Sequence, residues 1–349
     1  MKIGLAFNHV HGAVPVHRPP DVIAEYDTAE VTAAEAAALA AGGHEVVLLE
    51  ADEAFGERLA RARPDLVFNV AEGRIGAESR ESYVPAVCEA LAVPYTGSGP
   101  LTLALALDKA RTKEVLAWRG IATASWQVFA SPDEPLAPAL RFPLIVKLLH
   151  EGSSMGLEPA SVVDDECALR AQVARLIATY REPALVEEFI AGREFSLGLI
   201  GNFGAGAPRM MPMIEIVHTK PRSVVLFDPL PPVIDALIAP GRPHSEVAVY
   251  RDAARYTYEP VCPAPVDAGI ERRLRDTALA TFRALGCRDF CRMELRLRDG
   301  VPHVLDVNPI AGIGPGYWFP MMAAAAGHDY GAFIHLILNA ALERLGGRR

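Results

Sequence analysis

The strongest constraint on the fold is a pair of short alternating segments that meet at Asp299-Gly300, within residues 291–316. An Asp-Gly dipeptide between such segments favours a tight turn, so the sequence predicts a β-hairpin. Apolar residues occupy the odd positions and polar residues the even positions on both sides of the turn. Because directly opposed residues share a face, a two-residue turn would mix the two faces. The pattern therefore predicts a register one residue longer, with a three-residue loop and Gly300 in the left-handed region.

The predicted register places four polar side chains on one face of the hairpin. They are Arg292, Glu294, Asp306 and Asn308. Two carboxylates and a carboxamide oxygen suit a hard cation such as Mg²⁺, which takes oxygen ligands and usually keeps substrate phosphates in its shell. The arginine beside them could hold an anion. On the hairpin alone, an ordinary amphipathic hairpin whose solvated face carries two ion pairs explains the pattern equally well.

Composition bounds the class of protein. With 349 residues, 51% hydrophobic and 22% charged, the chain has the size and character of a soluble globular protein of two or three compact units. A net charge of −9 without long runs of one sign argues against a nucleic-acid partner. Five scattered cysteines without C-x-x-C spacing indicate reduced thiols and a cytoplasmic protein. No apolar stretch reaches the ~18 residues that a membrane span needs, so no membrane contact is expected.

The order of the predicted elements indicates an α/β and α+β organisation. Continuous apolar runs at residues 2–7, 44–50 and 66–70, with helical segments such as 28–42 between them, predict a layer of parallel strands over residues 1–98. The elements expected next are a helix over 100–119, strands near 125–129 and 142–149, a helix over 166–179 and a strand from 184. They form a small α+β unit over residues 99–184.

Residues 185–349 contain further strands, a helix over 268–285, the hairpin and two terminal helices. The Pro-rich stretch 218–265 within them shows no clear element. A span of that length inside a compact protein is more often a functional lid or binding loop than filler.

Two more stretches could contact a nucleotide. Lys147 ends an apolar strand and precedes a Gly/Ser loop with Ser153 and Ser154, whose donors could cradle phosphates. No Walker A sequence occurs, and taken alone such a loop is more often a plain turn. Residues 186–190 indicate a strand edge whose backbone could pair with an adenine, with Glu194 reaching ribose hydroxyls. Without further context, an exposed acidic strand end is the preferred interpretation of that stretch.

Six motifs form an ordered set that is too specific to be independent. They are Y-T-G-S-G (95–99), L-D-K-A-R-T-K (107–113), I-V-K-L-L-H-E-G-S-S-M-G (145–156), L-V-E-E-F-I-A-G-R-E-F (185–195), C-R-M-E-L (291–295) and L-D-V-N-P-I-A-G (305–312). In that order they resemble the D-alanine–D-alanine ligase family of ATP-grasp enzymes, over nearly the whole chain. The resemblance implies an N-terminal α/β domain (1–98), a central small ATP-grasp domain (99–184) and a C-terminal ATP-grasp domain (185–349), with ATP between the last two.

The resemblance also implies a role for each matching residue. The nucleotide-binding set is Lys109, Lys147, Ser154, Glu187, Glu188, Ile190, Glu194 and the lid residue Arg255. The metal ligands would be Glu294, Asp306 and Asn308, holding two Mg²⁺ ions, for which Mn²⁺ could substitute. The catalytic set is Arg292, Ser153, Glu30, Tyr256 and Gly312. In this set Arg292 and backbone N–H groups near Gly312 would stabilise an oxyanion, and Glu30 would lie near the first substrate's amino group.

The activity implied by the resemblance is ATP-dependent amide formation through an acyl phosphate. The implied partners are small amino-acid or amine substrates, and a homodimer is the expected assembly. Against the family pattern, a histidine is replaced by Glu72, and a Ser-Leu pair around the second substrate by Tyr317 and Trp318. These departures predict that the second substrate is not D-alanine but a bulkier or aromatic amine. The alternatives are a true D-alanine–D-alanine ligase of cell-wall synthesis and a catalytically inactive nucleotide-binding regulatory protein.

Overall fold

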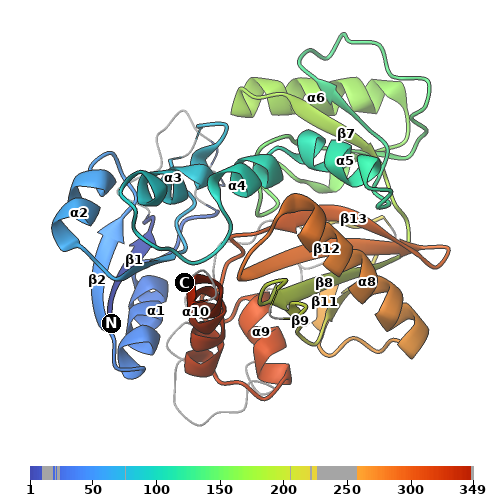
Figure 1. The fold of residues 1–349 in the computed structure, drawn as a ribbon. Helices are drawn as coiled ribbons and strands as arrows, with labels where there is room; N and C mark the ends of the chain where they lie inside the picture. Colours follow the sequence, from blue (N-terminus) through green and yellow to red (C-terminus); the bar gives the residue numbers. More distant parts are fainter. Residues whose placement is uncertain are drawn as a thin grey trace.

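The fold contains three β-sheets that are flanked by helices (Figure 1). The computed structural model describes residues 1–9, 19, 21, 24–74, 76–204, 206–220, 222–225 and 258–346. Among the helices that it describes, none has the length and apolar character to cross a membrane.

The first sheet is parallel, as predicted, with strand order β2-β1-β3. Its strands are β1 (Lys2–Phe7), β2 (Glu45–Glu50) and β3 (Leu66–Asn69), and its helices are α1 (Ala29–Ala41), α2 (Phe55–Ala62) and α3 (Tyr83–Ala90). Helix α1 begins at Thr28, whose hydroxyl accepts a hydrogen bond from the N–H of Val31 at 3.4 Å.

The predicted helix over residues 100–119 is two helices, α4 (Pro100–Leu107) and α5 (Lys109–Trp118). Asp108 separates them with an extended backbone, and its carboxylate accepts from the N–H of Arg111 at 3.0 Å. The prediction of one helix was wrong because aspartate competes for backbone donors and starts a new helix more readily than it continues one.

The second sheet is antiparallel with strand order β4-β7-β5-β6. Its strands are β4 (Trp126–Phe129), β5 (Leu144–Leu148), β6 (Val162–Val163) and β7 (Ala184–Glu188), and helix α6 (Glu166–Tyr180) packs on it. In Figure 1 this sheet and α6 lie above the third sheet.

The third sheet has the order β11-β10-β8-β12-β13, and β9 (Arg209–Met210) pairs with β8. Its other strands are β8 (Arg193–Ile200), β10 (Ile214–His218), β11 (Tyr258–Val261), β12 (Phe290–Arg298) and β13 (Val301–Asn308). Helix α8 (Ala268–Leu285) packs with one apolar cluster of this sheet, and α9 (Trp318–Ala325) and α10 (Tyr330–Gly346) pack with another.

Strand β11 lies inside the Pro-rich stretch 218–265, so the expectation of no element there was wrong for residues 258–261. Proline at position 260 is tolerated because β11 is an edge strand. Of the expected lid, residues 221 and 226–257 lie outside the described residues.

The hairpin of β12 and β13 confirms the polar pairing but not the predicted loop. Arg298 pairs directly with Val301, so the loop is the two-residue Asp299-Gly300 turn, and both residues have a left-handed backbone. The additional residue is a β-bulge between the Leu295–Val304 and Glu294–Asp306 pairs. The odd–even alternation of the sequence required one extra residue between the two polar segments. That residue lies within β13 rather than in the turn.

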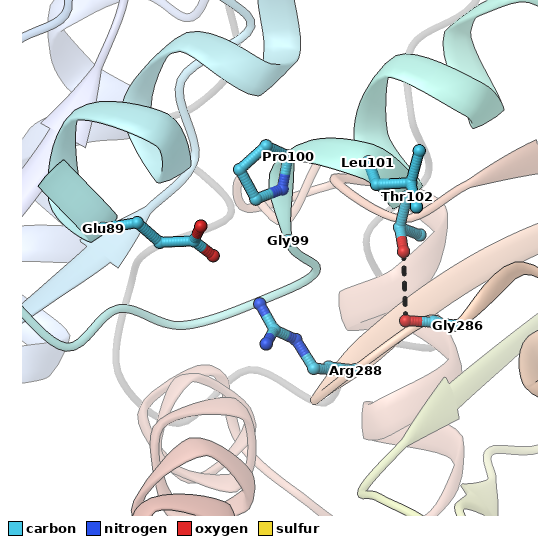
Figure 2. Close-up of a pocket in the computed structure, with 7 residues that line it drawn as sticks. All are labelled: Glu89, Gly99, Pro100, Leu101, Thr102, Gly286 and Arg288. Carbon is cyan, nitrogen blue, oxygen red and sulfur yellow. Dashed lines mark hydrogen bonds between the residues drawn. The ribbon is translucent and has the colours of Figure 1, made fainter.

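Asp289 joins the N-terminal unit to the third sheet and to α10. Its fully buried carboxylate accepts from the guanidinium of Arg344 at 2.8 and 2.7 Å, from Asn202 Nδ2 at 2.9 Å and from the N–H of Gly97 at 2.8 Å. Close by, a cavity of about 370 Å³ includes Arg288 and Gly286, and the Thr102 hydroxyl donates to the Gly286 carbonyl at 3.1 Å (Figure 2). The cavity lining includes none of the predicted site residues.

We expect D289A to lower the free energy of unfolding by about 3–5 kcal/mol, because the change leaves the Arg344 guanidinium without its buried counter-charge. Urea titration followed by circular dichroism measures the effect. The matched control is D276A on the exposed face of α8, which should change stability by less than about 0.5 kcal/mol. Equal effects of the two substitutions would contradict this role of Asp289.

Candidate active site

The centre of the candidate site is a buried carboxylate between two lysines. The side chains of Glu187 and Lys113 are each 2% exposed and lie 2.6 Å apart, and the second Glu187 oxygen lies 2.7 Å from Nζ of Lys147. Burial alone would raise the pKa of Glu187, but the two ammonium groups outweigh it and lower that pKa. Two cations against one anion leave a surplus positive charge, which suits a phosphate.

Lys113 also connects the second sheet to the third. Its Nζ donates to the hydroxyl of Thr123 at 2.8 Å, and that hydroxyl donates to the carbonyl of Val304 in β13 at 2.7 Å. Val304 lies two residues before Asp306, so the lysine cluster and the polar hairpin face are held in a defined relation. Burial would lower the pKa of Lys147, but the charges of Glu187 and Asp306 together raise it above its usual value.

The prediction of a strand edge at residues 186–190 was wrong for the residues in β7. This strand pairs with β4 on one side and β5 on the other, so its backbone is occupied. Glu187 points at the lysines, and Glu188 pairs with Arg298 at 2.5 Å. Beyond β7, the carbonyl of Ile190 accepts from Arg296 Nη1 at 3.0 Å.

The Gly/Ser loop is tied to Lys109, which is buried. Nζ of Lys109 donates to the carbonyl of Glu151 at 2.5 Å. Ser153 and Ser154 have φ values of +46° and +59°, a region that costs a residue with a side chain about 1–3 kcal/mol. Backbone strain of this kind is found at ligand clamps, so the phosphate-covering role of the loop stays a prediction.

Glu194, the expected ribose ligand, already has two hydrogen-bonding neighbours. One of its oxygens accepts from Arg296 at 2.8 and 2.5 Å, and lies 2.7 Å from Nε2 of His218. Burial would raise the pKa of Glu194, but hydrogen bonds and charge from His218 and Arg296 lower it. The carboxylate is therefore fixed as an acceptor through this one oxygen.

The hairpin face carries the predicted oxygen ligands in direct register. Glu294 pairs with Asp306 and Arg292 with Asn308 across the two strands. Glu294 Oε1 accepts from Arg292 Nε at 2.9 Å and from the Ser196 hydroxyl at 3.2 Å. Burial raises the pKa of Glu294; Arg292 opposes this and Asp306 adds to it.

Within the described part of the chain, no three His, Cys, Asp or Glu side chains form a metal-binding group. The donor set on the hairpin is two carboxylates and one carboxamide, and Mg²⁺ takes its remaining ligands from water and substrate phosphates. Two opposed carboxylates that disfavour each other's charge fit a cation between them, so the residues present suit Mg²⁺.

Tyr317 and Trp318 stand beside this face at the start of α9. The guanidinium carbon of Arg292 lies 5.7 Å from the Trp318 ring centroid, and the Tyr258 ring meets the Trp318 ring edge-on at 6.0 Å. A Cβ placed on Gly312 would lie 2.8 Å from the ring of Tyr317. Glycine at 312 is therefore required for the ring to approach the backbone.

The role expected for Glu30, near the amino group of the first substrate, stays a prediction. Glu30 is exposed in the first turn of α1. The carboxylates that the fold buries or half-buries nearby are Asp27, Glu35 and Glu72. Helix geometry explains the difference, since Glu35 lies on the face of α1 that packs inward. Arg255 and Tyr256 lie outside the described residues.

Comparison with known proteins decides the family. A profile of the D-ala D-ala ligase C-terminus family matches residues 115–228 and 236–339. The chain belongs to the D-alanine–D-alanine ligase family. It is 31% identical over 312 residues to the D-alanine–D-alanine ligase of Desulforudis audaxviator, covering 88% of this chain and 91% of that protein. It is also 34% identical over 320 residues to the uncharacterized protein y4sG of Sinorhizobium fredii, covering 89% and 87%.

The fold agrees with this assignment. The crystal structure of the Bacillus anthracis D-alanine–D-alanine ligase complexed with ATP superposes with a TM-score of 0.72 at 21% identity, covering 100% of both chains. The ligase-family member described here therefore has the ATP-grasp fold, and family membership makes it an ATP-dependent ligase.

Three residues of the site were not assigned from the sequence. They are Lys113, Arg296 and His218. Lys113 lies four residues after Lys109 on a helix, a spacing that places both on one side, and this was a usable signal. Arg296 continues the even-numbered polar face of β12, but its partners come from β8 and residue 223 and could not be read from the hairpin.

The buried Glu81 makes stability depend on pH. Burial raises its pKa to about 7, against the lowering effect of Arg80. Because the folded state holds this proton, the stabilisation is complete below about pH 4 and is lost as the pH rises through about 7. We expect the free energy of unfolding of E81Q, which mimics the protonated form, to rise relative to that of the wild type by about 2–3 kcal/mol as the pH goes from 4 to 8.

Urea unfolding of both proteins at pH 4, 6 and 8 checks this expectation. The exposed neighbour Glu78 provides the matched control, since E78Q should differ from the wild type by a nearly constant amount. A stability difference for E81Q that does not change with pH would show that Glu81 titrates normally.

Proposed function

We propose that the protein joins a carboxylate substrate to an amine in an ATP-dependent reaction that passes through an acyl phosphate. The observation that carries this proposal is the link between the lysine cluster around Glu187 and the oxygen ligands of β12 and β13, through Thr123 and Val304. A cationic cluster that is held in a fixed position relative to a set of oxygen ligands for a metal suits a nucleoside triphosphate.

In the first step an oxygen of the substrate carboxylate attacks the γ-phosphorus of ATP, the bond to the β-phosphate oxygen breaks, and ADP leaves. In the second step the neutral amine attacks the acyl carbon and the C–O bond to phosphate breaks. Inorganic phosphate and one proton leave, and the product is an amide. Phosphoryl transfer needs mainly alignment and charge neutralisation, which Lys109, Lys147 and the Ser153–Ser154 loop would supply.

Glu294, Asp306 and Asn308 would hold Mg²⁺, which when bound neutralises phosphate charge and aligns the transferred group. Arg292 lies next to these ligands, and its hydrogen bond to Glu294 comes from Nε rather than from its terminal nitrogens. We assign them to the oxyanion of the second step, together with backbone N–H groups near Gly312.

We infer that the second substrate is larger than D-alanine or differs from it in chemistry. Support comes from the two rings at residues 317 and 318. The Trp318 ring lies over Arg292, and the hydroxyl of Tyr317 lies 3.3 Å from Asp27 rather than offering itself to a small carboxylate. The flat face of an indole favours an aromatic or extended apolar group.

Two alternatives remain as outcomes of experiment. A D-alanine–D-alanine ligase would release phosphate efficiently with D-alanine alone. A nucleotide-binding protein without catalysis would bind ATP and release no ADP with any substrate pair. Against the second alternative, the charged positions of the lysine cluster and of the hairpin face all carry competent residues.

Substituting the proposed metal ligands tests the site. We expect E294Q and D306N to lose at least about 100-fold in ADP release while keeping the wild-type circular dichroism spectrum and melting curve, because each removes one charge from the ligand set. ADP is measured by a coupled assay over a Mg²⁺ titration. Wild-type turnover in both variants would refute the metal assignment.

Two of the three tryptophans, Trp318 and Trp118, allow a matched test of substrate size. We expect W318L to raise D-alanine-dependent phosphate release at least about tenfold relative to the wild type, because the substitution opens the pocket. W118L, at an 88% exposed position on α5, should leave that rate unchanged. If wild-type protein releases phosphate with D-alanine alone as fast as with any other amine, the inference about the second substrate is wrong.

A further inference from the structure

A buried carboxylate with no hydrogen-bonding partner lies at the inner face of α1. Glu35 is 0% exposed, and neither of its oxygens accepts a hydrogen bond from the residues that the structure describes. An ionised carboxylate in such a place costs several kcal/mol unless a cation compensates it. Buried polar groups in folded proteins nearly always have a hydrogen-bonding partner, so packing alone does not explain this carboxylate.

The direction of Glu35 follows from its helix. Val31 lies one turn before it on the same face, and a Cβ placed on Gly314 would lie 2.7 Å from Val31 Cγ1 and 3.2 Å from Tyr317 Cε2. This face of α1 therefore meets the loop that follows the hairpin and leads into α9. Helix α10 closes the same region, since Nε2 of His335 lies 3.1 Å from the Ala38 carbonyl.

Two further carboxylates approach from other segments. Asp27, just before α1, has the Tyr317 hydroxyl at 3.3 Å, and Glu72 comes from the loop after β3. Burial raises the pKa of Glu35 and that of Glu72, and the charge of Asp27 adds to both rises. For Glu72 the charge of Glu81 acts in the same direction, and Arg292 opposes it. None of the three forms an ion pair with an arginine, lysine or histidine in the described part of the chain.

Other buried carboxylates of this protein are compensated. Glu187 has two lysines, Glu194 has an arginine and a histidine, and Asp289 has an arginine. The three carboxylates of Asp27, Glu35 and Glu72, here called the acidic subsite, lack such a partner among the described residues. Asp27 lies beside Tyr317, at the edge of the proposed reaction site. Burial raises the pKa of the Tyr317 hydroxyl, and the charges of all three carboxylates add to that rise.

We propose that the acidic subsite binds a positively charged group that one of the two joined substrates carries in addition to its reacting carboxylate or amine. The substrate class is a diamino acid, a guanidino amino acid or a diamine. The α-ammonium of an ordinary amino acid supplies one positive charge, whereas three carboxylates without cations favour a substrate with a second one. This proposal rests on the proposed ligase function and specifies its substrate.

The test compares substrates that differ only in charge. Wild-type protein with MgATP is assayed for phosphate release with D- and L-forms of lysine, ornithine and arginine, each against its neutral counterpart norleucine, norvaline or citrulline, alone and with a second amino acid or amine. Mass spectrometry of the product identifies which substrate contributed its carboxylate. We expect kcat/KM for at least one cationic member to exceed that of its counterpart at least about tenfold.

Substitution of Glu35 assigns that preference to the subsite. In E35Q we expect the preference to fall below about threefold, with the rate for the neutral counterpart within about threefold of the wild type. E57Q, at an exposed position of α2, should keep the wild-type preference. Melting curves show whether E35Q folds, and D27N replaces it if it does not.

The outcomes separate the two proposals. Phosphate release in which every neutral counterpart equals its cationic partner, or an unchanged preference in folded E35Q and D27N, overturns the acidic subsite and leaves the ligase function standing. Absence of phosphate release with every pair overturns the ligase function. In that case calorimetric titration of the same pairs decides the subsite, since equal binding of charged and neutral members would overturn it.

Discussion

The arrangement of the site depends on Glu187, a single carboxylate buried between two ammonium groups. It lies in an inner strand and fixes Lys147 on the neighbouring strand and Lys113 on α5. Removing any one of the three would leave a buried charge with poorer compensation, so the positions of one helix and two strands are coupled through one ion cluster. Through Thr123 the same cluster is joined to β13, and thus to the strand that carries Asp306 and Asn308.

Much of this could be predicted from the sequence because local patterns carried it. Apolar runs predicted the parallel strands β1, β2 and β3, and odd–even alternation predicted the Glu294–Asp306 pairing. These features depend on neighbouring residues and on the periodicity of a strand, which a sequence displays directly. The family followed from motifs whose order, rather than any one of them, was specific.

What could not be predicted depends on contacts between distant segments. The sequence does not show that Glu187 faces inward, that Arg296 pairs with Glu194, or that Glu30 is exposed whereas Glu35 is buried. Each of these is decided by which face of an element meets another element, and that is set by packing. The continuous helix predicted over residues 100–119 failed for a local reason, because periodicity outweighed the capping tendency of Asp108.

The bulge in β13 has a consequence for how this protein can change. The extra residue lies between the turn and the polar face. The half of the hairpin near Asp299-Gly300 and the half with the Glu294–Asp306 pair therefore have different strand registers. Lengthening or shortening the turn by a residue would alter only the distal half, whereas deleting the bulged residue would rotate Asp306 to the apolar side. Natural variation and inserted tags should thus be tolerated at the tip of the hairpin and excluded at position 305.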